Sequence, residues 1–117
     1  MSEYVRTKTG IYKVLYRESM PIGFMYHIEI NPRTGSWKKI TDKSVIKEAD
    51  NIKELCDRFI VYVEDLDIYS IFDYYDEAES YFNALVEHPC ILHGVLETDK
   101  GLIYAAKLND ERDLKQL

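Results

Sequence analysis

Two histidines and a cysteine lie close together late in the chain, in the run His88-Pro89-Cys90-x-x-His93. Imidazole nitrogens and thiolate sulfurs are the ligands that zinc prefers, and Cys56 could approach them in the folded chain. A structural zinc site normally uses two short ligand pairs, however, and the odd spacing of Cys90 and His93 on a strand sends them to opposite faces. We therefore predict no metal site and no cofactor. His88 is better explained as a favourable cation near a helix C-terminus.

The same residues could instead form a thiol nucleophile, because a neighbouring His88 or His93 would lower the pKa of the Cys90 thiol. Nothing in the sequence orients such a base, and no cysteine hydrolase motif surrounds this cysteine. Without an export signal, both cysteines are expected to be reduced and buried. We predict that the protein is not an enzyme. A small metal- or thiol-dependent protein that uses His88, Cys90 and His93 is the alternative.

A long acidic window occupies the middle of the chain. Residues 59–99 contain ten Asp and Glu and no Lys or Arg, whereas residues 1–58 carry 11 Lys and Arg against 8 Asp and Glu. Paired carboxylates could perform acid-base chemistry or hold a divalent cation. The run Asp65-x-Asp67 nevertheless lacks the Gly and the closing Glu of a calcium loop. Carboxylates of this kind usually form a solvated face.

The leading functional hypothesis is a non-enzymatic protein that binds a protein partner. Ten tyrosines are more than a core of this size needs, and tyrosine is enriched in interfaces, although strands also favour it. An acidic, tyrosine-rich surface would attract a partner with a basic surface. A self-associating module, joined through exposed strand edges, is another alternative. The residues predicted to bind the partner are Glu64, Asp65, Asp67, Asp73, Tyr74, Tyr75, Asp76, Glu77 and Glu79.

Length and composition describe an ordinary globular protein. The chain has 117 residues, 46% of them apolar, so we expect one domain over residues 1–117 with one core. Apolar runs are short and Met1 is followed by polar residues, so we expect no membrane span, no export signal and a cytoplasmic location. The pI near 5.0 argues against direct nucleic-acid binding. The basic stretch around Trp37 could contact phosphate, but its five basic residues are few for a nucleic-acid interface: Arg33, Lys38, Lys39, Lys43 and Lys47.

Turn residues separate the first half of the chain into strands rich in Tyr, Val and Ile. Thr9-Gly10 predicts a hairpin between residues 4–7 and 11–17, and Asn31-Pro32-Arg33-Thr34-Gly35 predicts one between residues 22–30 and 36–40. A short strand is expected at 45–48. Further strands are predicted at 60–63 and 68–72, and a last hairpin joins residues 91–97 to 102–107.

Two helices are predicted. Asn51-x-x-Glu54 resembles a capping box, with Asp50 as the rival cap, and apolar residues at helical spacing extend the first helix to about Phe59. The second is expected over residues 74–88, with Asp73 as its cap and Pro89 as its terminator. The fold class is therefore α+β: a mainly antiparallel sheet built from hairpins, with two helices packed on one face. The charged tail, residues 109–117, is expected to fray.

Two segments carry a resemblance to other proteins. The run from Lys47 to Asp57, KEADNIKELCD, and the run from Gly94 to Asn109, GVLETDKGLIYAAKLN, resemble segments of small uncharacterised proteins encoded by phages and prophages of Gram-positive bacteria. The resemblance implies a bacterial cytoplasm and an accessory role in the phage programme. It implies no reaction and no catalytic residue.

Overall fold

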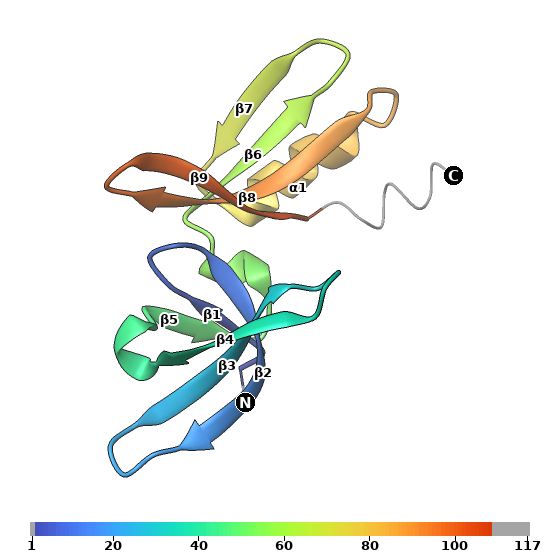
Figure 1. Ribbon diagram of the computed structural model, residues 1–117. Helices are drawn as coiled ribbons and strands as arrows, with labels where there is room; N and C mark the ends of the chain where they lie inside the picture. The colour runs from blue at the N-terminus through green and yellow to red at the C-terminus, as the bar shows by residue number, and fades with distance from the viewer. Residues whose placement is uncertain (1, 109–117) are drawn as a thin grey trace. The chain divides into compact units, whose positions relative to one another are not determined.

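The computed structural model describes residues 2–108, which form two antiparallel sheets (Figure 1). The chain divides into two compact units, Met1–Leu55 (unit 1) and Cys56–Leu117 (unit 2). The expected fraying of residues 109–117 lies outside the described residues, and the single domain over residues 1–117 stays a prediction. Within the described part of the chain, no helix has the length and apolar character needed to span a membrane.

Unit 1 is a five-stranded antiparallel sheet in the order β4-β3-β2-β1-β5. Both predicted hairpins are confirmed, and Gly35 takes the positive φ of 73° that the second turn requires. Asp42–Ser44 forms a 3-10 turn before the last strand. The strands are β1 (Tyr4–Arg6), β2 (Ile11–Ser19), β3 (Phe24–Asn31), β4 (Ser36–Thr41) and β5 (Lys47–Ala49).

A small apolar core holds unit 1 together. Val5, Tyr26 and Ile28 are its buried members, and half-buried side chains such as Tyr12 and Ile40 pack against them. The buried Tyr26 hydroxyl donates a hydrogen bond to Glu48 Oε2 at 3.2 Å. Its pKa is raised, first by burial and then by the charge of that carboxylate.

The helix predicted from residue 51 to about 59 is a single 3-10 turn, Ile52–Leu55, so the prediction of two helices on one face is not confirmed. Its cap was predicted correctly, because Asn51 Oδ1 accepts a hydrogen bond from the Glu54 amide at 3.2 Å. The turn ends early because the chain enters a sheet, where the Asp57 amide donates to the Val95 carbonyl at 2.9 Å. The β-branched run that follows favours a strand.

Unit 2 is a four-stranded antiparallel sheet in the order β7-β6-β8-β9. The predicted strands and their turns are confirmed. β6 is the most buried strand, with five of its six residues apolar, because it lies between β7 and β8. The strands are β6 (Arg58–Val63), β7 (Ile68–Phe72), β8 (Cys90–Thr98) and β9 (Gly101–Lys107).

One α-helix, α1 (Tyr75–Ala84), packs on unit 2 and is shorter than the predicted 74–88. Its N-cap residue is Tyr74, not Asp73, and no side chain caps it. The helix ends early because the chain must place Cys90 beside Val63, and because Pro89 disfavours a helical conformation at His88. Ala78 and Phe82 face inward, against Phe59, Val61, Val63, Cys90 and Leu92.

Candidate partner-binding surface

His88, Cys90 and His93 lie in three different environments of unit 2. His88 is in the loop after α1, and its Nδ1 lies 2.8 Å from Asp65 Oδ2. Cys90 is buried in the core under the helix. His93 is on the opposite face of β8, beside Ile60 of β6 and Lys107 of β9. The structure therefore does not bring the three together, and among residues 2–108 no three His, Cys, Asp or Glu are placed to hold a metal ion.

The two cysteines are also separate. Cys56 lies against Gly94, whereas Cys90 begins the same strand four residues earlier, about 13 Å away along an extended chain. Both are thiols, Cys90 buried and Cys56 half-buried. His88 faces Asp65, and the centroids of the His93 and Tyr104 rings lie 4.5 Å apart.

The titration of His93 is shifted by its surroundings in unit 2. Burial, followed by the nearby positive charge of Lys107, lowers its pKa below the usual 6.5. The neutral imidazole is thus favoured in the folded protein. A neutral ring in contact with Tyr104 acts as part of an apolar surface, not as a cation.

The predicted acidic residues fall into two groups. The antiparallel register of β6 and β7 places the turn with Glu64, Asp65 and Asp67 at one end of the hairpin. Asp73 and the first turns of α1, with Asp76, Glu77 and Glu79, begin at the other end, where Phe72 pairs with Phe59. Five paired positions separate the two ends, about 17 to 20 Å. All of these carboxylates are exposed, but they do not form one cluster.

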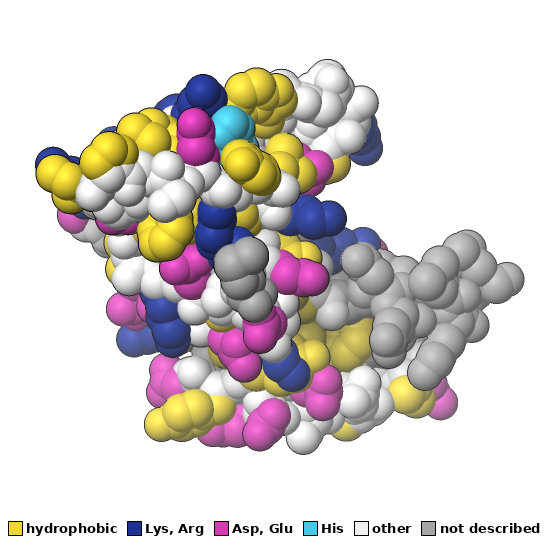
Figure 2. Space-filling model, turned by 90° about the horizontal axis from the view of Figure 1, so that it is seen from below, with side chains coloured by type: hydrophobic (Ala, Val, Ile, Leu, Met, Phe, Trp, Pro, Cys, Tyr) yellow, Lys and Arg dark blue, Asp and Glu magenta, His cyan; other side chains and the backbone are white. Residues whose placement is uncertain are grey.

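Several of these carboxylates have partners. Asp65 faces His88, and Arg58 Nε lies 2.8 Å from Glu97 Oε1 and 3.6 Å from Asp73 Oδ1. Figure 2 shows one face of the molecule, on which acidic side chains lie among basic, apolar and neutral ones. Charge alone is therefore a weaker basis for partner binding than the sequence suggested, because part of it is neutralised locally.

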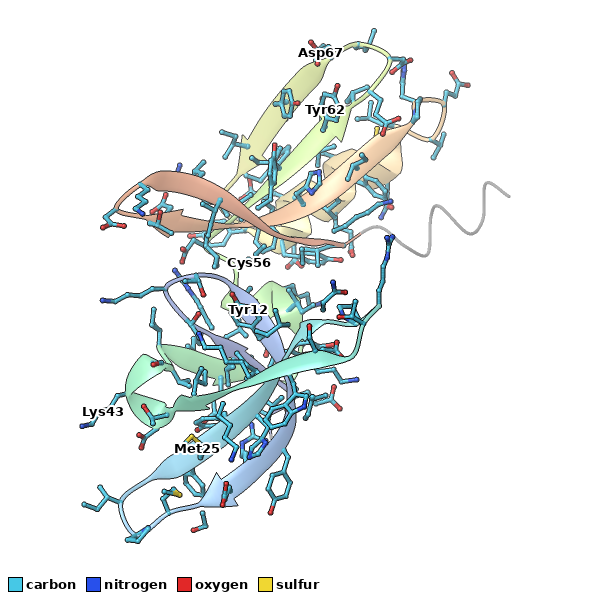
Figure 3. The ribbon with its side chains drawn as sticks, in the orientation of Figure 1. Tyr12, Met25, Lys43, Cys56, Tyr62 and Asp67 are labelled. Atoms are coloured by element: carbon cyan, nitrogen blue, oxygen red, sulfur yellow. The ribbon has the colours of Figure 1, made fainter. Side chains whose placement is uncertain are left out.

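The tyrosines of the predicted site differ in their roles. Tyr74 is exposed, whereas the half-buried Tyr75 packs edge-on against Phe59 and donates a hydrogen bond to Glu79 at 2.7 Å. At the other end of the hairpin, Tyr62 donates to Asp67 at 3.0 Å (Figure 3). This hydrogen bond is the main cause that raises the pKa of Tyr62 to about 12. Tyr74 is thus the exposed ring of the predicted set.

A surface that the sequence reasoning missed lies on the sheet face opposite α1. Side chains of paired strand residues share a face, so Phe59, Val61 and Val63 point to the helix while Ile60 and Tyr62 point away from it. Within residues 56–108, no helix covers this second face (Figure 1). We call it the open face; its members are Ile60, Tyr62, Tyr69, Ile71, Ile91, His93 and Tyr104.

The centre of the open face is apolar, and Lys107, which pairs with His93, lies at its edge. Ile60 pairs with Ile71 on one side and His93 on the other, and the Tyr62 and Tyr69 rings stack at 4.3 Å. Ile60 is buried at its centre, whereas Tyr69, Ile71 and Tyr104 expose 55%, 53% and 58% of their surface. The signal in the sequence was that β6 is apolar at consecutive positions, which is typical of a strand with a partner on each face.

Comparison with known proteins adds no relative: no protein-family model, no curated protein and no solved structure matches this chain. The resemblance to phage-encoded proteins therefore stays a prediction.

Proposed function

We propose that this is a non-enzymatic binding protein whose unit 2 holds a protein partner against the open face. The observation that carries the proposal is an apolar, aromatic sheet face that remains exposed while the opposite face is covered by α1. A contiguous exposed patch of this kind is typical of an interaction site. Following the sequence resemblance, the proposal takes the partner to be a host or phage protein in a bacterial cytoplasm.

Aromatic rings on the two edge strands of this face would supply most of the affinity. Tyr69 and Tyr104 are each more than half exposed, so covering either ring removes about 100 Å² from water and contributes roughly 2 to 3 kcal/mol. Tyrosine anchors of this kind often dominate the energy of an interface. The stacked partner of Tyr69, Tyr62, is held in place by Asp67, so the ring pair enters the interface already ordered.

The acidic residues set the chemistry of the partner. Residues 56–117 contain 14 Asp and Glu against 5 Lys and Arg, and Asp67 of the β6–β7 turn lies beside the open face, where it accepts the hydrogen bond of Tyr62. A partner with an apolar centre and a rim of Lys and Arg matches this arrangement. A nucleic acid does not, because its phosphates would be repelled by the same carboxylates.

Affinity capture from a bacterial lysate tests this proposal. The tagged wild type is compared with the double variant Ile71→Ser/Tyr104→Ser, and with Ile22→Ser, which changes an isoleucine of unit 1 that is 92% exposed. We expect a partner that the wild type and Ile22→Ser retain and that the open-face variant loses. Retention should also weaken with salt, since the acidic contribution is screened.

A partner bound equally by the open-face variant, or no partner at low salt, would contradict the proposal. Sedimentation of the purified protein separates out self-association: a dimer that Ile71→Ser/Tyr104→Ser abolishes would make a second copy of this chain the occupant of the open face.

A further inference from the structure

A pocket of about 330 Å³ opens in unit 1, and every residue that lines it belongs to that unit. Its walls come from the β1–β2 turn, from β2, β3 and β4, and from the 3-10 turn after β4. The volume is at the lower end of the range for small-molecule sites, with room for roughly ten groups of the size of a water molecule. Nothing in the proposed role of unit 2 uses this pocket.

Three lysines from three separate segments surround the pocket: Lys8 from the β1–β2 turn, Lys38 from β4, and Lys43 from the 3-10 turn. Figure 3 labels Lys43 together with Tyr12, which lines the pocket from β2. Within residues 2–108, none of the three ammonium groups takes part in an ion pair or hydrogen bond. Three lysines therefore line one small volume, and their ammonium groups have no counter-ion in the described chain; the Lys43 side chain extends outward from its turn (Figure 3).

The alternation of β4 explains why Lys38 belongs to the pocket. Lys38 pairs with Ile28, a buried core residue, so the two side chains lie on the same face of the sheet, together with Ile40. Its neighbour Lys39 pairs with His27 and points to the opposite face. Lys38 and Lys39 are thus a matched pair of exposed lysines, one at the pocket and one away from it.

No Asp or Glu is among the residues that line the pocket. Several acids of unit 1 are placed elsewhere. Glu48 pairs with Arg17 at 2.7 Å, Glu18 lies 3.5 Å from His27, and the Asp42 carboxylate lies against Gly23 in the β2–β3 turn. The positive potential of the three lysines is therefore not cancelled at the site itself.

The remaining lining is aliphatic, with a polar corner. Four isoleucines supply the apolar wall, Ile28 and Ile40 among them, and Tyr12 is the single aromatic residue in the lining. Its hydroxyl lies 2.8 Å from Thr9 Oγ1, which in turn lies 3.1 Å from Thr7 Oγ1. Aliphatic walls suit an alkyl chain better than a nucleobase, because bases gain their binding energy by stacking on aromatic rings.

We propose that unit 1 binds, in this pocket, an anionic group carried on an aliphatic body: the lysines hold the anion and the isoleucines cover the chain. Two sources present this chemistry, a short fatty acid and the carboxyl-terminal aliphatic residue of a peptide. Both join a carboxylate to a branched or linear alkyl group that the pocket can enclose.

Titration of the full-length ¹⁵N-labelled protein by NMR tests the proposal, with sodium octanoate as the first probe. We expect saturable shifts of amides in the β1–β2 turn and the 3-10 turn after β4. Lys38→Gln should weaken binding about two- to fivefold, the range for one partly solvated ion pair, and Lys8→Gln/Lys38→Gln/Lys43→Gln by more. Lys39→Gln, the matched control, should bind as the wild type does.

Further probes test the negative charge and the alkyl chain separately, and they distinguish a fatty acid from a peptide terminus. We expect 1-octanol, which lacks the charge, and inorganic phosphate, which lacks the chain, to bind more weakly than octanoate. Comparison of N-acetyl-Ala-Ile with its carboxyl-terminal amide then shows whether a peptide terminus is preferred to a fatty acid. Equal binding of octanol and octanoate, equal effects of Lys38→Gln and Lys39→Gln, or no saturable shift up to the solubility limit of octanoate would overturn the inference.

Discussion

The contact between Gly94 and Cys56 makes a sharp prediction about the packing of unit 2. A β-carbon added at Gly94 would point toward the helix-covered face and overlap with Cys56 Sγ. Ordinary contacts between such atoms are about 3.5 to 4.0 Å. The other two neighbours, Cys56 Cβ and Leu108 Cδ1, would be at 3.4 Å and can be accommodated. The sulfur atom is therefore the obstacle to a side chain at this position.

Gly94→Ala should destabilise the protein because the clash outweighs the gain in the backbone. Without a clash, alanine in a strand would be favoured over glycine by about 0.5 to 1 kcal/mol. Overpacking of a well-packed core costs about 1 to 3 kcal/mol. We expect a net loss of about 1 to 2 kcal/mol in the free energy of unfolding, measured by urea denaturation followed by far-UV circular dichroism.

A double-mutant cycle isolates the contact. Cys56→Ala removes the sulfur, so Gly94→Ala introduced into that background should be neutral or stabilising, with a favourable coupling of at least about 1 kcal/mol. Cys90→Ala is the matched control, because that thiol lies about 13 Å along β8 and should show no coupling. Equal effects of Gly94→Ala in the wild-type and Cys56→Ala backgrounds would refute the packing described here.

Three more predictions concern unit 2. The pKa of His93 is lowered in the folded protein, so this residue stabilises the fold above pH 6.5, and the contribution is lost as the pH falls through the folded pKa. His93→Gln should therefore flatten the dependence of the free energy of unfolding on pH below 6.5. An unchanged slope in that range would contradict the prediction. Asp67→Asn should lower the pKa of Tyr62 from about 12 toward 10, measured by NMR of its ring carbon, whereas Asp65→Asn should leave it unchanged. Phe82→Ala should cost about 3 to 5 kcal/mol, because the ring is buried under α1. Phe82→Ala also tests whether residues 1–117 form one domain. If they do, the substitution must lower the unfolding midpoint measured by circular dichroism and the midpoint measured by Trp37 fluorescence in unit 1 by the same amount.

Much of the secondary structure was predictable because its signals are local. The residues Asn31, Pro32 and Gly35 favour a turn whichever strands pair on either side of it, and Asn51 caps its turn as predicted. The length of that turn was not predictable from the helical spacing of apolar residues. Arg58–Val63 is drawn into the centre of a sheet instead, and the long-range pairing with β7 and β8 overrides the local pattern.

The candidate sites depended far more on tertiary structure. A run such as 64–79 is contiguous in sequence, yet the hairpin turns Asp65 and Asp73 to opposite ends of two paired strands. The basic stretch was visible in the sequence, but whether Lys38 or Lys39 meets the isoleucines depends on which face of β4 is turned inward. The alternation of side chains along a strand defines two faces, but it does not indicate which face the rest of the protein covers.

The amino-acid sequence by itself determined the strand and turn positions, the antiparallel character of the sheets and the unequal charge of the two halves, because these follow from neighbouring residues. Only the tertiary structure decided that α1 covers Phe59 and leaves Ile60 and Tyr62 on the open face, that Cys56 fills the space beside Gly94, and that three lysines surround one pocket. Each of these depends on residues far apart in the chain, whose meeting is set by strand register and core packing.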